Sequence, residues 1–159
     1  MALPKTKLRE AIFQILFSLD TGHATEKEII ELIMAELKIT RKFATEAFNS
    51  ASAIYEKVDA IDTEISSIVK AYSLDRIQRA ERNILRVGVY EILYQKEIPP
   101  LVSISEAIRL SNKFSTKEAS KFINAILDAV MKKQKGEVID PSAVQSAFSD
   151  LEKATDHEV

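Results

Sequence analysis

Apolar residues recur every three to four positions along most of the chain, and no stretch alternates apolar with polar residues as a half-buried strand does. This spacing places the apolar side chains on one face of each of a series of helices, so we expect an all-α fold. About seven helices are predicted, over residues 5–20, 25–37, 41–58, 60–71, 76–94, 103–113 and 116–133.

Small and polar residues mark the ends of these helices. Gly22 predicts a left-handed cap after the first helix, and Pro99-Pro100 interrupts the chain because proline donates no backbone hydrogen bond. A hydroxyl residue followed three positions later by glutamate predicts a capping box. This pattern occurs as Thr25 with Glu28, Ser103 with Glu106, and Ser115 with Glu118.

The helix predicted over 76–94 has apolar residues over too wide a surface for a single face. Such a helix is expected to be central and contacted on several sides. It also contains Gly88, and glycine in a helix interior costs about 1 kcal/mol relative to alanine. We therefore predict that a neighbouring helix approaches closely at Gly88.

The composition removes most kinds of chemistry. Cysteine is absent and there are only three glycines, so no thiol nucleophile and no glycine-rich phosphate loop is available. The two histidines, His23 and His157, have no second histidine at ligand spacing, so we expect no metal and no other cofactor. Acids, bases and nucleophiles form no visible catalytic set, and the prediction is that the protein is not an enzyme. No signal peptide and no run of about 18 apolar residues is present, which predicts a cytoplasmic protein without a membrane partner.

Charge is distributed unevenly along the chain. The formal net charge is −2, but residues 137–159 carry six acids and one lysine, which leaves +3 on residues 1–136. We therefore expect a mildly basic body over residues 1–135 and an acidic extension over 136–159. The extension is either partly helical, starting at Asp140-Pro141 with an apolar side, or disordered, with a frayed end.

Two groups of basic residues are candidates for binding an anionic partner. Lys5, Lys7 and Arg9 lie at the start of the first helix, where cations oppose the helix dipole, although a solvated N-terminus is the simpler explanation. A strip of four arginines on the helix over 76–94 suits bidentate pairing either with phosphate or with carboxylates of other helices. The strip consists of Arg76, Arg79, Arg82 and Arg86.

A third candidate is the segment 112–122, which joins two predicted helices and contains three lysines, two phenylalanines and several hydroxyl residues. Proteins that bind single-stranded RNA combine cations for phosphate, aromatic faces for stacking and small polar groups for base edges. Phe122 also lies on the apolar stripe of its helix and fits a core position equally well, whereas Phe114 lies at a helix end.

Four blocks of sequence follow one another in a specific order: residues 9–17 (REAIFQILF), 79–93 (RAERNILRVGVYEIL), 98–108 (IPPLVSISEAI) and 121–128 (KFINAILD). Together they resemble the NusB family of transcription antitermination factors, over roughly residues 5–132. The resemblance implies two packed three-helix subdomains that share a helix, and a function without catalysis. It also implies that the chain pairs with NusE, a small-subunit ribosomal protein. The pair would bind the boxA element of nascent ribosomal RNA within an RNA polymerase antitermination complex.

The resemblance also assigns residues to two binding faces. The implied RNA face comprises Lys5, Lys7, Arg9, Arg86, Lys113, Phe114, Ser120, Lys121, Phe122 and Asn124. The implied NusE face comprises Phe13, Phe17, Asp20, Glu81 and Glu91. Because the N-terminus has fewer arginines than is usual in the family, RNA binding without NusE is expected to be weak.

Two alternative functions are compatible with the residues alone. One is a helical protein-interaction module or homodimer without a direct RNA role, in which the phenylalanines of segment 112–122 are structural. The other is an RNA-modifying enzyme, against which the lack of a glycine-rich cofactor-binding domain argues.

Overall fold

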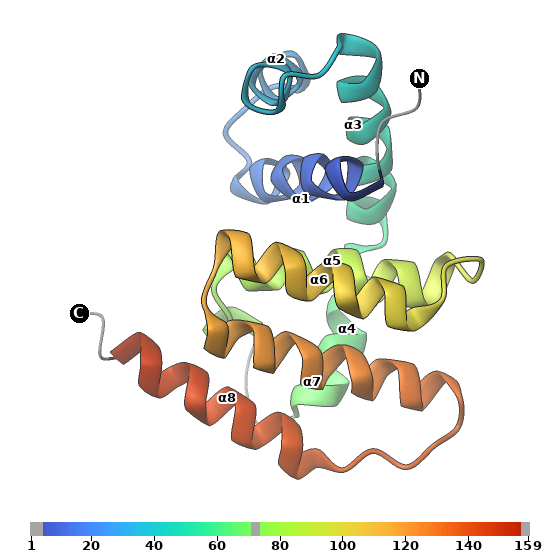
Figure 1. Cartoon of the computed structure of the whole chain (residues 1–159), viewed down its shortest axis with the longest axis vertical. Coiled ribbons are helices and arrows are strands. Elements are labelled where there is room, and N and C mark those ends of the chain that lie inside the picture. Colours follow the sequence, from blue (N-terminus) through green and yellow to red (C-terminus); the bar gives the residue numbers. More distant parts are fainter. Residues whose placement is uncertain (1–4, 71–73, 157–159) are drawn as a thin grey trace. The chain divides into compact units, whose positions relative to one another are not determined.

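The computed structural model describes residues 5–70 and 74–156 of the chain, with side chains described as far as residue 154. Within these ranges every regular element is helical, which confirms the all-α prediction (Figure 1). The elements are α1 (Lys5–Thr21), α2 (Glu26–Leu37), α3 (Arg41–Glu56), α4 (Val58–Val69), the 3-10 turn η1 (Leu74–Arg76), α5 (Arg79–Tyr94), α6 (Pro100–Phe114), α7 (Lys117–Gln134) and α8 (Pro141–Asp156).

The chain divides into two compact units, residues 1–58 and 59–159. In the first unit α1, α2 and α3 pack against one another around buried aliphatic and aromatic side chains such as Ile15, Ile33 and Phe48. In the second unit α5 packs on α6 and α7, and α7 also packs on α6 and α8. Among the described residues the first unit therefore has three α-helices, and the second has the five from α4 to α8.

Helix boundaries agree with the predictions to within three residues. The helix predicted over 76–94 begins only at Arg79, and Arg76 belongs to the separate η1 turn. The helix predicted over 60–71 ends at Val69, and its predicted last residue lies outside the described ranges. Gly22 has the predicted left-handed conformation, with φ of +72°.

One of the three predicted capping boxes is confirmed. The hydroxyl of Thr25 accepts from the Glu28 N–H at 3.2 Å, and the Glu28 carboxylate accepts from the Thr25 N–H at 3.1 Å. This backbone hydrogen bond, and then the hydroxyl contact, hold the pKa of Glu28 below its ordinary value. The box therefore contributes to stability above the ordinary pKa of glutamate and weakens as the pH falls through the lowered pKa.

The other two boxes are wrong, each for a local reason. The helix predicted from Ser103 already begins at Pro100, which is favourable in a first turn, and Ser103 is buried inside α6. At the next helix the cap is Thr116, whose hydroxyl accepts from the Ala119 N–H at 3.1 Å. Ser115 caps the end of α6 instead.

Gly88 on α5 marks a close approach between helices, as predicted. A Cβ atom added at this position would lie 2.8 Å from Cδ1 of Leu127 on α7. Leu127 is fully buried, so its side chain has little room to move away. Glycine thus allows α5 and α7 to pack more closely than alanine would.

Replacing Gly88 by valine should lower the free energy of unfolding by about 1–3 kcal/mol, because the added carbons must enter space filled by Leu127. Urea unfolding followed by circular dichroism measures the change. In a Leu127→Ala background the same replacement should cost less, since the shortened side chain leaves room. An equal cost in both backgrounds would contradict the close approach.

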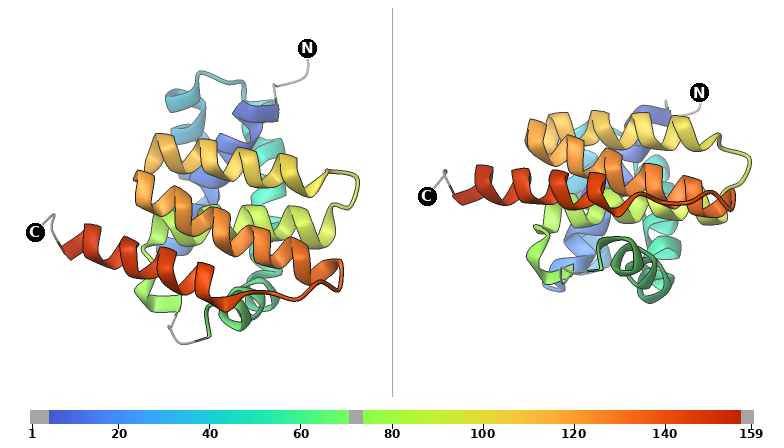
Figure 2. Two further views of the ribbon diagram at one scale, coloured as in Figure 1. Left: turned by 60° about the horizontal axis from the view of Figure 1, so that its bottom comes forward. Right: turned by 90° about the horizontal axis from the view of Figure 1, so that it is seen from below.

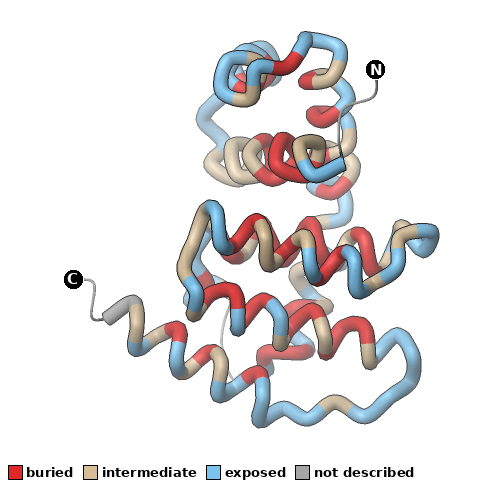
Figure 3. Tube along the Cα trace, viewed as in Figure 1, coloured by how far each residue is buried: buried red, intermediate tan, exposed pale blue. Residues whose placement is uncertain are grey.

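The acidic extension forms α8, which packs along α7 (Figures 1 and 2). Its apolar side is buried, as Figure 3 shows by the buried positions spaced along α8. The Phe148 ring lies 5.3 Å from the Phe122 ring, and the Arg76 guanidinium covers the Phe148 ring and pairs with Glu152. The helical alternative is therefore correct for residues 141–156, while His157 and the predicted frayed end at 157–159 lie outside the described residues.

Candidate nucleic-acid interface

The turn between α6 and α7 has exposed lysines on both sides and an aromatic ring beside it. Only Ser115 and Thr116 separate the two helices. Lys113 and Lys117 flank this turn and are exposed, and Phe114 is half-buried. The Lys113 Nζ atom lies 5.6 Å from the centroid of the Phe114 ring.

Helix α7 extends this surface along one side. Lys117, Lys121 and Asn124 are all exposed and are spaced four and three residues apart, which puts them on one face of the helix. Lys117 was not among the residues that the family resemblance assigned, although its four-residue spacing from Lys121 was visible in the sequence. We define the turn surface as Lys113, Phe114, Lys117, Lys121 and Asn124.

Two predicted RNA contacts on α7 point inward instead. The Ser120 hydroxyl lies 2.8 Å from the Asn112 Oδ1 atom, 3.0 Å from the Ser111 hydroxyl and 3.2 Å from the Thr116 carbonyl oxygen. Phe122 is fully buried, so its ring offers no face to a base. Ser120 bonds to residues at the end of α6 and in the turn, and the Phe122 ring packs on Phe148 of α8, so we leave both out of the turn surface.

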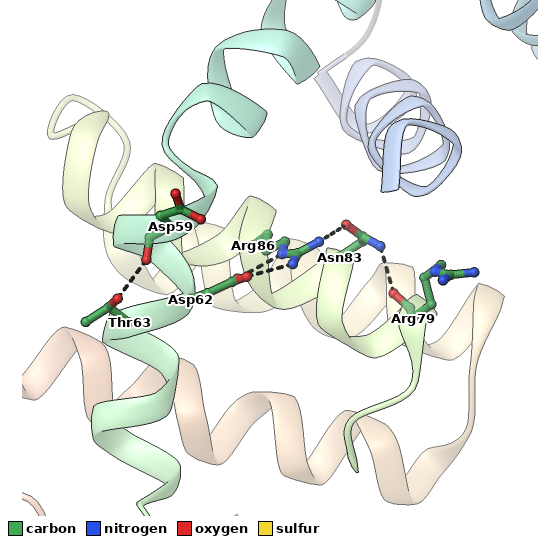
Figure 4. A network of polar contacts seen from close by, with 6 residues as sticks. All are labelled: Asp59, Asp62, Thr63, Arg79, Asn83 and Arg86. Carbon is green, nitrogen blue, oxygen red and sulfur yellow. Dashed lines mark hydrogen bonds and ion pairs between the residues drawn. The ribbon is translucent and has the colours of Figure 1, made fainter. Parts of the chain in front are cut away.

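Arg86 is also buried, with a side chain only 6% exposed. Its Nε and one Nη atom donate to the two Asp62 carboxylate oxygens at 2.9 and 2.7 Å, and its other Nη atom donates to the Asn83 amide oxygen at 3.0 Å. Figure 4 shows this pair between α4 and α5. The prediction that Arg86 contacts RNA is replaced by a structural ion pair, in line with the alternative explanation of the arginine strip.

The N-terminal cations lie in the first unit. Lys5 is exposed, Lys7 is half-buried and Arg9 is buried, and the first turn of α1 contains no acidic residue to offset the helix dipole. Of the three, Lys5 presents the most surface to an anionic partner.

The residues predicted to bind NusE are less accessible than expected. Phe13 is buried with its ring 6.3 Å from the ring of Phe17, and Phe17 and Asp20 are half-buried. Glu81 and Glu91 of α5 are 2% and 5% exposed. Each of these glutamates accepts a hydrogen bond from a serine of the second unit, so neither presents its carboxylate at the surface.

The described residues contain no group of three or more histidine, aspartate or glutamate side chains arranged to hold a metal ion. In the same part of the chain, no helix combines the length and apolarity that crossing a bilayer requires. The turn surface therefore stands out by its charge and its aromatic ring, not by any chemistry of its own.

A model of the NusB family matches residues 6–132, which include α1 and the whole turn surface. The chain belongs to the NusB family. This places it among transcription antitermination factors. Helix α8 lies beyond the matched residues.

Individual relatives agree with this assignment. The chain is 38% identical to the transcription antitermination protein NusB of Methylacidiphilum infernorum, over 82% of this chain and 92% of the relative. It is 36% identical to the protein of the same name from Chlamydia pneumoniae, over 80% of this chain and 79% of the relative.

Solved structures show the same fold. T. maritima NusB superimposes with a TM-score of 0.69 at 30% identity, covering 91% of this chain and 99% of that one. A crystal structure of the antitermination factors NusB and NusE in complex with double-stranded RNA has a chain that superimposes with a TM-score of 0.62 at 28% identity. That match covers 81% of this chain and 96% of the other.

Proposed function

We propose that this NusB-family protein, together with NusE, binds boxA-type single-stranded RNA of nascent ribosomal transcripts in the bacterial cytoplasm and helps RNA polymerase resist termination. The observation that carries the proposal is the turn surface, where three lysines are exposed and one of them, Lys113, lies over the Phe114 ring. The existence of a related NusB structure with both NusE and RNA supports it.

The chemistry of the turn surface matches an RNA strand with unstacked bases. Lys113, Lys117 and Lys121 can each neutralise a phosphate and release its counterions. The Phe114 ring offers an aromatic face for one base, and the Asn124 amide can both donate to and accept from a base edge. Lys5 and Lys7 of the first unit stay separate candidates for phosphate contacts.

We propose a smaller NusE-binding face than the family resemblance implies. Phe17 and Asp20 of α1 have accessible surface, and Phe13 packs behind Phe17 and holds it. The carboxylates of Glu81 and Glu91 are left out because both are buried in the second unit.

Reversing the charge of Lys121 should weaken RNA binding about tenfold and reduce the slope of log affinity against log salt by about one, because one phosphate contact is lost. Replacing Phe114 by alanine should weaken binding by a similar factor through the loss of stacking, with an unchanged slope. Titration of labelled boxA RNA at several salt concentrations, with and without NusE, measures both effects.

Lys135→Glu is the matched control, since it makes the same charge change on an exposed lysine at the opposite end of α7. It should leave the affinity within about twofold, apart from the general effect of net charge. Unchanged RNA binding in both Lys121→Glu and Phe114→Ala at matched salt would refute the proposed RNA face. That result would favour a protein-interaction module or homodimer.

A further inference from the structure

Helices α5 and α6 run antiparallel and are joined near both ends by the same kind of contact. Near one end the Ser103 hydroxyl donates to the Glu91 carboxylate at 2.9 Å. Near the other the Ser115 hydroxyl donates to the Glu81 carboxylate at 2.8 Å. The two pairs share chemistry and burial of the glutamate, but only the second lies at the turn surface.

Glu81 has a buried carboxylate with only one of its two oxygens hydrogen-bonded among the described residues. Its side chain is 2% exposed, and its second oxygen, Oε2, is buried and accepts no hydrogen bond among the described residues. A buried carboxylate with one oxygen unsatisfied is costly, so stability alone does not explain it. A role in holding the geometry of its partner explains it better, because a charged acceptor forms a strong, directional hydrogen bond.

The partner of Glu81 is the residue on which the turn depends. Ser115 is directly joined to Phe114, its N–H donates to the Ser111 carbonyl at 2.7 Å, and Thr116 follows as the cap of α7. With only two residues between the helices, fixing the Ser115 side chain limits the directions that Lys113, Phe114 and Lys117 can take.

We propose that Glu81 is a positioning residue for RNA: through Ser115 it holds the turn between α6 and α7 so that the Phe114 ring and the flanking lysines meet the strand together. This inference rests on the RNA role proposed above. It assigns Glu81 to the RNA side of the protein, in place of the direct NusE contact that the family resemblance implies.

The test compares the two serine–glutamate pairs. We expect Glu81→Ala and Ser115→Ala each to weaken binding of boxA RNA to the full chain on the order of five- to tenfold. The double variant should bind RNA as tightly as the single variant with the lower affinity, because both replacements remove the same constraint. Glu81→Gln keeps an acceptor for Ser115 and should retain more affinity than Glu81→Ala. Glu91→Ala and Ser103→Ala should change RNA affinity less than twofold.

RNA affinity is measured at low salt without NusE, and NusE affinity is measured without RNA. Both are measured at a temperature well below the thermal unfolding midpoint of the least stable variant. NusE affinity should stay within twofold for every variant. If Glu81→Ala does not fold, Ser115→Ala and Glu81→Gln carry the comparison, since each changes fewer atoms.

Three outcomes would overturn the positioning role. Equal losses of RNA affinity in the Glu81 and Glu91 pairs would mean that both pairs act only on the fold. Weaker NusE binding with unchanged RNA binding would restore Glu81 to the NusE face. If the Glu81 and Ser115 variants bind RNA normally while Lys121→Glu weakens binding, the positioning role is rejected and the RNA function stands. If Lys121→Glu has no effect either, the RNA function itself is rejected.

Discussion

Replacing Asp62 by alanine should lower the free energy of unfolding by about 3–5 kcal/mol, because the Arg86 guanidinium would stay buried without this carboxylate. The side chains of Arg86 and Asp62 are 6% and 22% exposed, so water screens the pair weakly. The amide of Asn83 accepts one hydrogen bond from Arg86 but supplies no negative charge. Urea unfolding followed by circular dichroism gives the change.

Asp59→Ala is the control, because Asp59 is exposed on the same helix and the change removes the same charge. Its cost should stay within about 0.5 kcal/mol. Replacing both partners with apolar residues, Asp62→Leu with Arg86→Met, should recover much of the loss, since a buried ion pair contributes little over well-packed apolar side chains. A loss in Asp62→Ala no larger than in Asp59→Ala would show that the ion pair does not matter for folding.

The helices were largely predictable because their apolar periodicity is a local property of the sequence. Gly88 was predictable for a related reason, as a costly residue on the most apolar helix needs a packing explanation, and Leu127 provides it. The helix starts near Pro100 and Thr116 were less predictable. Two hydroxyl residues stand side by side at 115–116. The Ser115 hydroxyl is bonded to Glu81, a distant residue in sequence, and the Thr116 hydroxyl caps α7.

Some of the candidate binding residues lie inside the fold and others lie at its surface. Arg86 and Glu81 have their partners 24 and 34 positions away in sequence, at Asp62 and Ser115. No local sequence pattern encodes such distant pairs. In the sequence alone, a charged residue that pairs inside the fold therefore looks the same as one that faces a ligand. The exposed lysines of the turn surface were easier to predict, because a short turn between two helices lies at the surface in almost any packing.

The acidic extension combines a negative net charge with a local apolar pattern, which is why a helix was one of its two predicted alternatives. Val144, Phe148 and Leu151 repeat at four and three residues and form the buried side of α8. The residues that match the family model end at 132, and α8 lies beyond them. Its contacts with Phe122 and Arg76 tie it into the second unit.

Replacing Phe148 by alanine should therefore lower the free energy of unfolding by about 3–5 kcal/mol, the usual cost of removing a fully buried phenylalanine. If the extension did not contribute to stability, the same replacement would not measurably change the free energy of unfolding. Gln145→Ala, at an exposed position of the same helix, should change the free energy by less than about 0.5 kcal/mol.

A double-mutant cycle with Phe122→Leu then separates the two rings. Because their centroids lie 5.3 Å apart, the two losses should fall short of additivity by about 0.5–1.5 kcal/mol. Strict additivity would mean that α8 is stabilised elsewhere than on Phe122. The RNA affinity of the Phe122→Leu variant tests the role of Phe122 separately. If this affinity is unchanged, the Phe122 ring packs against α8 inside the second unit and does not stack on a base, and Phe114 is the stacking residue of the turn surface.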